Sequence, residues 1–214
     1  MKKSLKIENV SISYQKDYFA LYNINYEFFL NHNYMIVGES ESGKSTFARF
    51  ICGLEKKYTG NVYLDDNNVD FENSFFKNEI VFLPSIQVFF ENKTALDNLK
   101  YAYSIRNVDN SLDFSGVLEK FNLLDMSNEK LKNLSKYEKV LLSLARAYLR
   151  KFTFLVVDEA FTGLSSNELK TIINKIKLLD YKTLIITSKN EYDIFKREFK
   201  ITDIINIKAG FISF

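Results

Sequence analysis

The chain has 214 residues with 46% hydrophobic and 26% charged side chains, which is an ordinary balance for a globular domain. Its formal net charge is only +2, so we expect no nucleic-acid partner. The single cysteine, Cys52, excludes an internal disulfide, and no apolar run approaches the roughly 20 residues that cross a bilayer.

The predicted elements alternate between strands and helices, which indicates an α/β fold. In chain order we expect strands at residues 6–14, 22–30, 34–37, 62–64, 80–83, 152–157, 183–187 and 204–207. We expect helices at residues 46–52, across 94–150 and at 165–179. Strict alternation in the second strand puts Tyr22 on the same face as Ile24 and Phe28. We predict one domain over residues 1–214, with a helical subdomain at approximately residues 86–150.

Residues 38–45 match the phosphate-loop pattern G-x-x-x-x-G-K-[ST], between a predicted strand and a predicted helix. Glycines let successive backbone N–H groups turn toward phosphate oxygens, and the helix that follows adds its positive end. Lys44 would reach the β- and γ-phosphates, and Ser45 would bind Mg²⁺. A polar loop that matches by chance is the alternative, which the flanking elements disfavour. The predicted nucleotide-binding residues are Gly38, Glu39, Ser40, Glu41, Ser42, Gly43, Lys44, Ser45 and Thr46.

An apolar strand at residues 154–157 ends in two carboxylates, Asp158 and Glu159. We predict that Asp158 binds Mg²⁺ and that Glu159 orients or deprotonates the attacking water, with Lys44 as the second catalytic residue. The alternative is a strand that simply turns polar at the surface. The phosphate loop elsewhere in the chain favours the catalytic interpretation.

Together with residues 6–14 and 58–65, these motifs resemble the ATP-binding subunits of ABC transporters from end to end. The resemblance implies an α/β P-loop NTPase core of ABC type, with a mixed sheet flanked by helices. It also implies an antiparallel β subdomain and an inserted helical subdomain. The implied ligands are ATP and Mg²⁺.

The resemblance implies two further nucleotide contacts. Tyr14 occupies the place of an aromatic residue that stacks on adenine, although a core aromatic is an equal alternative. Ser135 occupies the signature loop, which in the family contacts the γ-phosphate of ATP held by the opposite subunit. Ser135 and Glu138 also form the pattern of a helix capping box, and both interpretations can hold together.

Four departures from the family pattern affect positions outside the phosphate loop. Lys136 and Tyr137 replace the signature glycines, and Ser85 replaces the loop glutamine. Ser188 replaces the switch histidine, and the last of the four is Ser165, which replaces an aspartate. The one histidine, His32, is interpreted as a solvated turn residue. We therefore hypothesise a subunit that binds MgATP well but hydrolyses it slowly, or one that works beside a different, more regular subunit, in which case the two sites of the dimer would be unequal.

The resemblance implies partners for the chain: membrane-spanning transporter subunits and a second ATP-binding subunit, identical or different. It implies a peripheral location on the cytoplasmic face of the cell membrane. One alternative is a regulatory subunit with negligible hydrolysis, and another is a soluble ABC-type ATPase that transports nothing. Measuring phosphate release distinguishes the regulatory subunit from a transport motor. Membrane co-fractionation distinguishes the soluble ATPase from both.

Three other features have a plainer interpretation. Cys52 is expected to be a small core residue. The pairs Phe75-Phe76 and Phe89-Phe90 are interpreted as core packing, with contact to a membrane subunit as the alternative.

Overall fold

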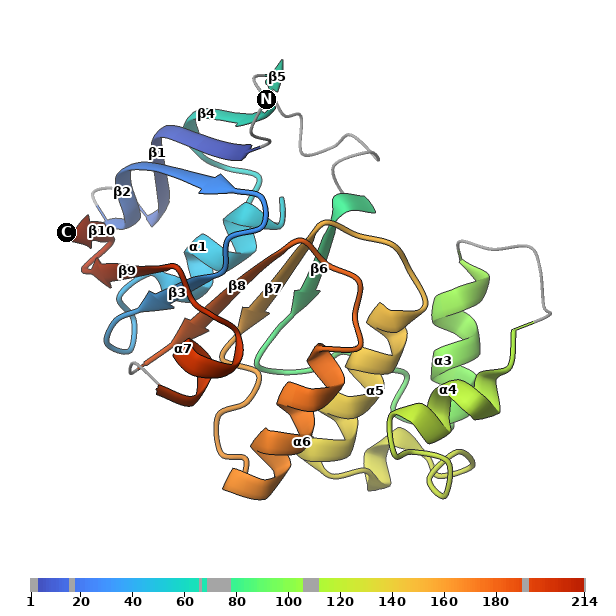
Figure 1. The fold of residues 1–214 in the computed structure, drawn as a ribbon. Coiled ribbons are helices and arrows are strands. Elements are labelled where there is room, and N and C mark those ends of the chain that lie inside the picture. Colours follow the sequence, from blue (N-terminus) through green and yellow to red (C-terminus); the bar gives the residue numbers. More distant parts are fainter. Residues whose placement is uncertain are drawn as a thin grey trace. The chain divides into compact units, whose positions relative to one another are not determined.

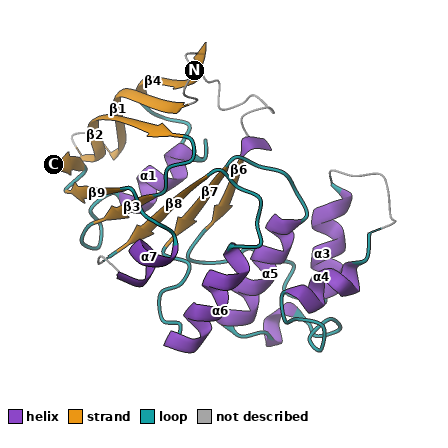
Figure 2. Cartoon of the chain, viewed as in Figure 1, coloured by secondary structure: helices purple, strands orange, loops and turns teal. Residues whose placement is uncertain are grey.

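The computed structural model describes residues 4–15, 18–65, 67–68, 78–105, 112–189 and 193–213. The chain divides into two compact units. The first comprises Met1–Pro84, Phe152–Glu159 and Tyr181–Phe214, and the second comprises Ser85–Lys151 and Ala160–Asp180. Within the described ranges, the strands belong to the first unit and the second is built of helices (Figures 1 and 2). No helix within these ranges combines the length and the apolar character needed to cross a membrane.

The first unit contains a six-stranded sheet in which β10 runs antiparallel to β9 and the other neighbours run parallel. Every residue of three strands is buried, which explains their continuous apolar runs. Because parallel strands end at one edge of a sheet, the segments that follow them meet there. In spatial order the strands are β10 (Phe211–Ser213), β9 (Asp203–Lys208), β3 (Tyr34–Val37), β8 (Thr183–Ser188), β7 (Phe154–Asp158) and β6 (Ile80–Leu83).

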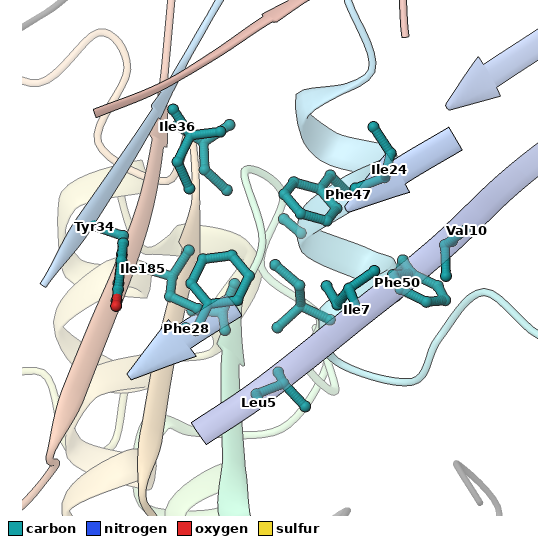
Figure 3. Close-up of a cluster of buried hydrophobic side chains, with 14 of the residues drawn as sticks. Leu5, Ile7, Val10, Ile24, Phe28, Tyr34, Ile36, Phe47, Phe50 and Ile185 are labelled. Atoms are coloured by element: carbon teal, nitrogen blue, oxygen red, sulfur yellow. The ribbon is translucent and has the colours of Figure 1, made fainter. Parts of the chain in front are cut away.

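A second, antiparallel sheet belongs to the same unit. Its order is β2 (Tyr18–Phe29), β1 (Ser4–Gln15), β4 (Thr59–Leu64) and β5 (Asn67–Asn68). Helix α1 (Lys44–Ile51) packs against β2 as well as against β7 and β8. Its buried Phe47 and Phe50, one turn apart, meet Ile7 and Phe28 in the core (Figure 3). The short helix α7 (Asp193–Glu198) also belongs to this unit and buries Phe195.

A β-bulge in β2 reverses the predicted orientation of Tyr22. Along this strand, Val10 pairs with Ile24 but Ile12 pairs with Leu21, so β2 contains one extra residue. Asn23, inside the bulge, has φ 51°. Leu21 and Ile24 are both buried, whereas Tyr22 is 44% exposed. The prediction that Tyr22 shares a face with Ile24 is therefore wrong, because one inserted residue moves a side chain to the other face.

The second unit breaks the predicted helical stretch into separate helices and also takes in residues 160–180. Helix α5 packs against α3, α4 and α6 and buries a continuous apolar face. The elements are α3 (Ala95–Ser104), α4 (Phe114–Lys120), the 3₁₀ turn η1 (Leu131–Asn133), α5 (Lys136–Tyr148) and α6 (Ser166–Ile176). Three of the helices begin with a complete capping box, from Thr94, Ser135 and Ser165.

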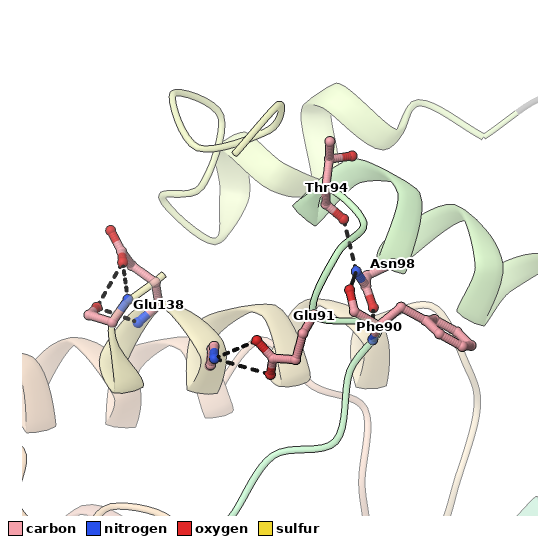
Figure 4. A network of polar contacts seen from close by, with 7 residues as sticks. Phe90, Glu91, Thr94, Asn98 and Glu138 are labelled. Atoms are coloured by element: carbon pink, nitrogen blue, oxygen red, sulfur yellow. Dashed lines mark hydrogen bonds and ion pairs between the residues drawn. The ribbon is translucent and has the colours of Figure 1, made fainter. Parts of the chain in front are cut away.

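A buried amide fixes the loop before α3 (Figure 4). The Asn98 side chain accepts from the Phe90 N–H at 2.9 Å and donates to the Phe90 and Thr94 carbonyls at 3.1 and 2.9 Å. Lys139 on α5 forms an ion pair with Glu91 at 3.1 Å. The chain between β6 and α3 is thus held by these side-chain contacts together with backbone hydrogen bonds, among them those from Leu131 and Lys132 to the Lys93 and Glu91 carbonyls.

Candidate functional site

Two glycines of the phosphate loop are required by close backbone contacts. At Gly38 a Cβ atom would lie 2.2 Å from the Ile207 carbonyl oxygen on β9. At Gly43, where φ is 108°, a Cβ atom would lie 2.5 Å from the Ala20 carbonyl oxygen on β2. No side chain fits at either position without displacing backbone, so the loop is packed into the sheet framework.

Backbone hydrogen bonds connect the phosphate loop to the turn between β9 and β10, and connect that turn to β2. The Gly210 N–H donates to the Ser42 carbonyl at 2.9 Å, and the Tyr22 N–H donates to the Gly210 carbonyl at 2.9 Å. Helix α1 then starts at Lys44 with no side-chain cap and no acidic residue in its first turn. Its first N–H groups and its positive end therefore remain available to an anion.

Lys44 is buried and already engaged. Its Nζ donates to the Glu39 carbonyl at 2.8 Å and lies 3.3 Å from Glu159 Oε1. Glu39 and Glu41 are both exposed; Glu39 does not line the cavity described below, whereas Glu41 does.

Asp158 joins the loop to the end of β8. Its Oδ1 accepts from Ser45 Oγ at 3.0 Å and from Thr187 Oγ1 at 2.7 Å. Burial raises the pKa of Asp158, and the two hydroxyl hydrogen bonds oppose that rise. The Glu159 N–H donates to Thr187 Oγ1 at 3.1 Å, and Glu159 has φ 47°. Positive φ is strained for a non-glycine residue, so the contacts around Glu159 must hold it in this conformation.

A cavity of about 510 Å³ extends from the loop to the antiparallel sheet. Tyr14 lines it, is 55% exposed, and donates from Oη to Thr46 Oγ1 at 3.4 Å. This placement disfavours the core interpretation of Tyr14, and stacking on adenine stays a prediction. The lining residues are Tyr14, Tyr18, Phe19, Ala20, Ser40, Glu41, Gly43, Lys44, Ser45, Thr46, Glu159, Ala209 and Gly210.

Ser135 lies in the second unit, whereas the other predicted site residues lie in the first. It caps α5: the Glu138 N–H donates to Ser135 Oγ at 3.3 Å, and the Ser135 N–H donates to Glu138 Oε2 at 2.7 Å. The capping-box prediction is confirmed, and a phosphate contact by Ser135 stays a prediction. Lys136 donates from Nζ to the Thr162 carbonyl at 2.6 Å.

The residues at the other divergent positions have structural surroundings of their own. Ser188 is buried at the end of β8, and Ser85 is exposed. Gln87, two residues after Ser85, accepts a hydrogen bond from Ser143 on α5. His32 lies in the turn after β2, half-buried with its ring 6.3 Å from that of Tyr34, and does not line the cavity.

The predictions of core packing for Cys52 and for the two phenylalanine pairs have different outcomes. Cys52 is half-buried against the core cluster, and burial raises the pKa of its thiol, as expected of a core cysteine. Phe89 is half-buried, with the Arg146 guanidinium 5.1 Å from its ring centre. Phe90 is exposed, so core packing is wrong for Phe90. The pair Phe75-Phe76 lies outside the described residues.

The chain belongs to the ABC transporter family, whose model matches residues 21–162. It is 28% identical over 207 residues to the microcin-J25 export ATP-binding/permease protein McjD of Escherichia coli, covering 91% of this chain and 35% of that protein. It is 26% identical over 216 residues to the ergothioneine transport ATP-binding protein EgtV of Helicobacter pylori (strain G27), covering 97% and 100%. The chain thus spans about a third or less of the first curated relatives, at 35% and 27% of their lengths.

The fold agrees with a solved ATP-binding cassette. The dimeric structure of such a cassette in a post-hydrolysis state, bound to ADP and Pi, superposes with a TM-score of 0.83. Sequence identity to it is 24%, and the match covers 98% of this chain and 97% of that one. The predicted α/β fold, with a mixed sheet, an antiparallel sheet and helices, is confirmed.

Proposed function

We propose that this chain is the ATP-binding domain that powers an ABC transporter by binding and slowly hydrolysing MgATP. The observation that carries the proposal is the convergence of Lys44, Asp158 and Glu159 at one edge of the parallel sheet. Hydrogen bonds and an ion pair join them directly or through Ser45 and Thr187. Family membership and the names of the relatives support the same function.

The oxygen atoms beside the loop fit a magnesium ion. Ser45 Oγ and Asp158 Oδ1 are 3.0 Å apart. Neighbouring ligands of an octahedral ion with bonds of 2.0–2.1 Å are about 2.9 Å apart, so both oxygens could be ligands with little movement. Among the described residues no three His, Cys, Asp or Glu side chains form a metal-binding group. That fits Mg²⁺, which is commonly held by one or two protein ligands, substrate phosphates and water.

The chain's own residues account for the chemical step. The loop N–H groups and the start of α1 hold the phosphates, and Lys44 moves from Glu159 to the β- and γ-phosphates. Bound Mg²⁺ supplies neutralisation of charge on the phosphates. Glu159, released from Lys44, accepts a hydrogen bond or a proton from the water that attacks the γ-phosphate. The Glu159 N–H donates to Thr187 Oγ1, which holds the backbone of Glu159 in place.

Slow hydrolysis is proposed because two positions that take part in hydrolysis in the family, the switch histidine and the signature glycines, are occupied by other residues here. At the end of β8 the chain has the buried hydroxyl of Ser188, where the family has the imidazole of a histidine. At the start of α5, Lys136 and Tyr137 present side chains where the family has glycines, so close approach of that backbone to a phosphate is hindered. These features also favour the second candidate, a regulatory subunit that binds ATP and hydrolyses almost none.

An apolar surface in the second unit supports a membrane-subunit partner. Ile86 and Val88 are 80% and 78% exposed, and Phe90 is also exposed. Hydrogen bonds hold this segment: Arg146 donates to the Val88 carbonyl at 3.0 Å, and the Asn98 side chain accepts from the Phe90 N–H at 2.9 Å. We propose that this surface docks the chain on the cytoplasmic side of its membrane subunits. Replacing Ile86 and Phe90 by serine should abolish co-fractionation with membranes, and unchanged co-fractionation would contradict the proposal.

Phosphate release by the purified chain tests the catalytic proposal. We expect slow steady release that Lys44→Ala abolishes. Glu159→Gln should retain MgATP binding and lose at least about 100-fold in rate, since general bases contribute roughly 10²–10⁴-fold. Binding without release by the unmodified chain would favour the regulatory subunit. Release that survives both replacements would contradict the proposed site.

A further inference from the structure

We propose that Phe19 is a nucleobase-binding residue of this cavity, held in place by Tyr22 and Phe211. The proposal rests on the proposed function, in that it takes the ligand to be a nucleotide. It adds a base contact on β2 to the phosphate contacts of the loop and to the predicted stacking by Tyr14.

The lining of the cavity is divided by chemistry. One part consists of loop and helix residues that suit phosphates, such as Lys44 and Ser45, together with the carboxylates of Glu41 and Glu159. Another part is aromatic and comes from the antiparallel sheet: Tyr14 on β1, and Tyr18 and Phe19 on β2. A ligand with an anionic end and a flat aromatic end matches both parts. The volume of about 510 Å³ lies within the usual range for small-molecule sites.

Phe19 has no polar atom that would explain its exposure. Its side chain is 44% exposed and lines the cavity. In the sheet, Phe19 on β2 pairs with Ser13 on β1. A tyrosine at such a position keeps its hydroxyl in water, whereas a phenylalanine gains nothing from solvent. A flat base lying on the ring would cover it.

Two further rings hold Phe19 in one orientation. Its ring centre is 5.0 Å from that of Tyr22 at an interplanar angle of 72°. Tyr22 in turn lies 5.4 Å from Phe211 on β10. The Tyr22 N–H also donates to the carbonyl of Gly210, which lines the cavity. The β-bulge at Asn23 is what turns Tyr22 away from the core, so the same irregularity provides the support for Phe19.

The test compares MgATP with magnesium tripolyphosphate, which has the phosphates without the base, by isothermal titration calorimetry. Stacking of a base on an aromatic side chain changes affinity by about 5- to 150-fold, so Phe19→Ala should weaken MgATP binding by at least about fivefold. Affinity for tripolyphosphate should stay within about twofold of wild type. Tyr22→Ala should give a smaller loss for MgATP alone, and Tyr22→Phe should restore the affinity.

Controls separate this proposal from the function on which it rests. Lys44→Ala should lose both ligands, and retention of both by that variant would overturn the nucleotide site itself. Tyr101→Ala removes a ring of similar exposure in the second unit and should change neither affinity. Phe19→Leu keeps apolar bulk without a ring and should lose the base contact, even where Phe19→Ala lowers the melting temperature. Unchanged MgATP affinity in Phe19→Leu, or equal losses for both ligands, would overturn the proposal.

Discussion

At the scale of single residues, the phosphate loop depends on backbone packing as much as on Lys44. Gly43 and Gly163 both have positive φ, 108° and 81°, but only Gly43 has a neighbour that a methyl group would strike. Comparing an alanine replacement at Gly43 with one at Gly163 therefore separates the cost of conformational strain from the cost of steric overlap. A single methyl group is the probe in both cases.

We expect Gly163→Ala to lower the free energy of unfolding by about 1–2 kcal/mol, the cost of a left-handed conformation. Gly43→Ala should lose a further 1–3 kcal/mol, roughly, because the Ala20 carbonyl must move. It should also weaken MgATP binding, which Gly163→Ala should leave unchanged. Urea denaturation and calorimetry measure both effects, and equal losses of stability would contradict the steric argument.

The sequence reveals the site residues whose roles are local and misses those that folding brings in. Lys44 and Ser45 are recognisable because their spacing and flanking elements suffice. Thr187 is not, because its hydrogen bond to Asp158 depends on the register of β8 against β7. Phe19 faces the cavity only through the pairing of β1 with β2 and the arrangement of the rings behind it.

At the scale of elements, helix starts are predictable and strand irregularities are not. The Ser-x-x-Glu pattern at Ser135 identified the start of α5 because a capping box is contiguous in sequence. The bulge at Asn23 left no such pattern, and alternation alone put Tyr22 on the wrong face. A one-residue shift in pairing is decided by the partner strand, which a single sequence does not specify.

The capping box of α6 gives a prediction that depends on pH. Glu168 accepts from the Ser165 hydroxyl and N–H at 2.6 and 2.8 Å, and these bonds hold its pKa below the usual 4.5. Because the pKa of Glu168 is lower in the folded chain than in the unfolded chain, its carboxylate stabilises the fold at pH values above the unfolded pKa. That stabilisation is lost as the pH falls through the folded pKa. Ser165→Ala should lower the melting temperature at pH 7, and the difference from wild type should narrow below about pH 4.

The control for that experiment is the same replacement in a Glu168→Gln background. Glutamine keeps the reciprocal hydrogen bonds of the box without a group that titrates. The effect of Ser165→Ala should then be independent of pH. A narrowing of equal size in both backgrounds would mean that Glu168 is not its source.

At the scale of the whole molecule, the predicted contact by Ser135 requires two chains. If Ser135 completes the site of an opposite subunit, phosphate release per chain should rise with protein concentration. Adding an excess of Lys44→Ala chains to dilute unmodified chain should raise the rate further, because their Ser135 is intact. Chains that carry both Lys44→Ala and Ser135→Arg should not. A rate per chain that is independent of concentration and of added partner would contradict pairing of like chains.

The ion pair between Lys44 and Glu159 means that the proposed catalytic carboxylate would compete with the nucleotide phosphates for the same lysine. Their 3.3 Å contact occupies the ammonium group that we propose binds the phosphates of the nucleotide. Glu159 is 32% exposed, so after solvent screening the pair is worth about 1 kcal/mol or less, which limits the competition to roughly fivefold in affinity. Glu159→Gln should accordingly bind MgATP slightly more tightly than the unmodified chain. In each catalytic cycle Lys44 would then exchange Glu159 for a phosphate when the nucleotide binds, and return to Glu159 when the products leave.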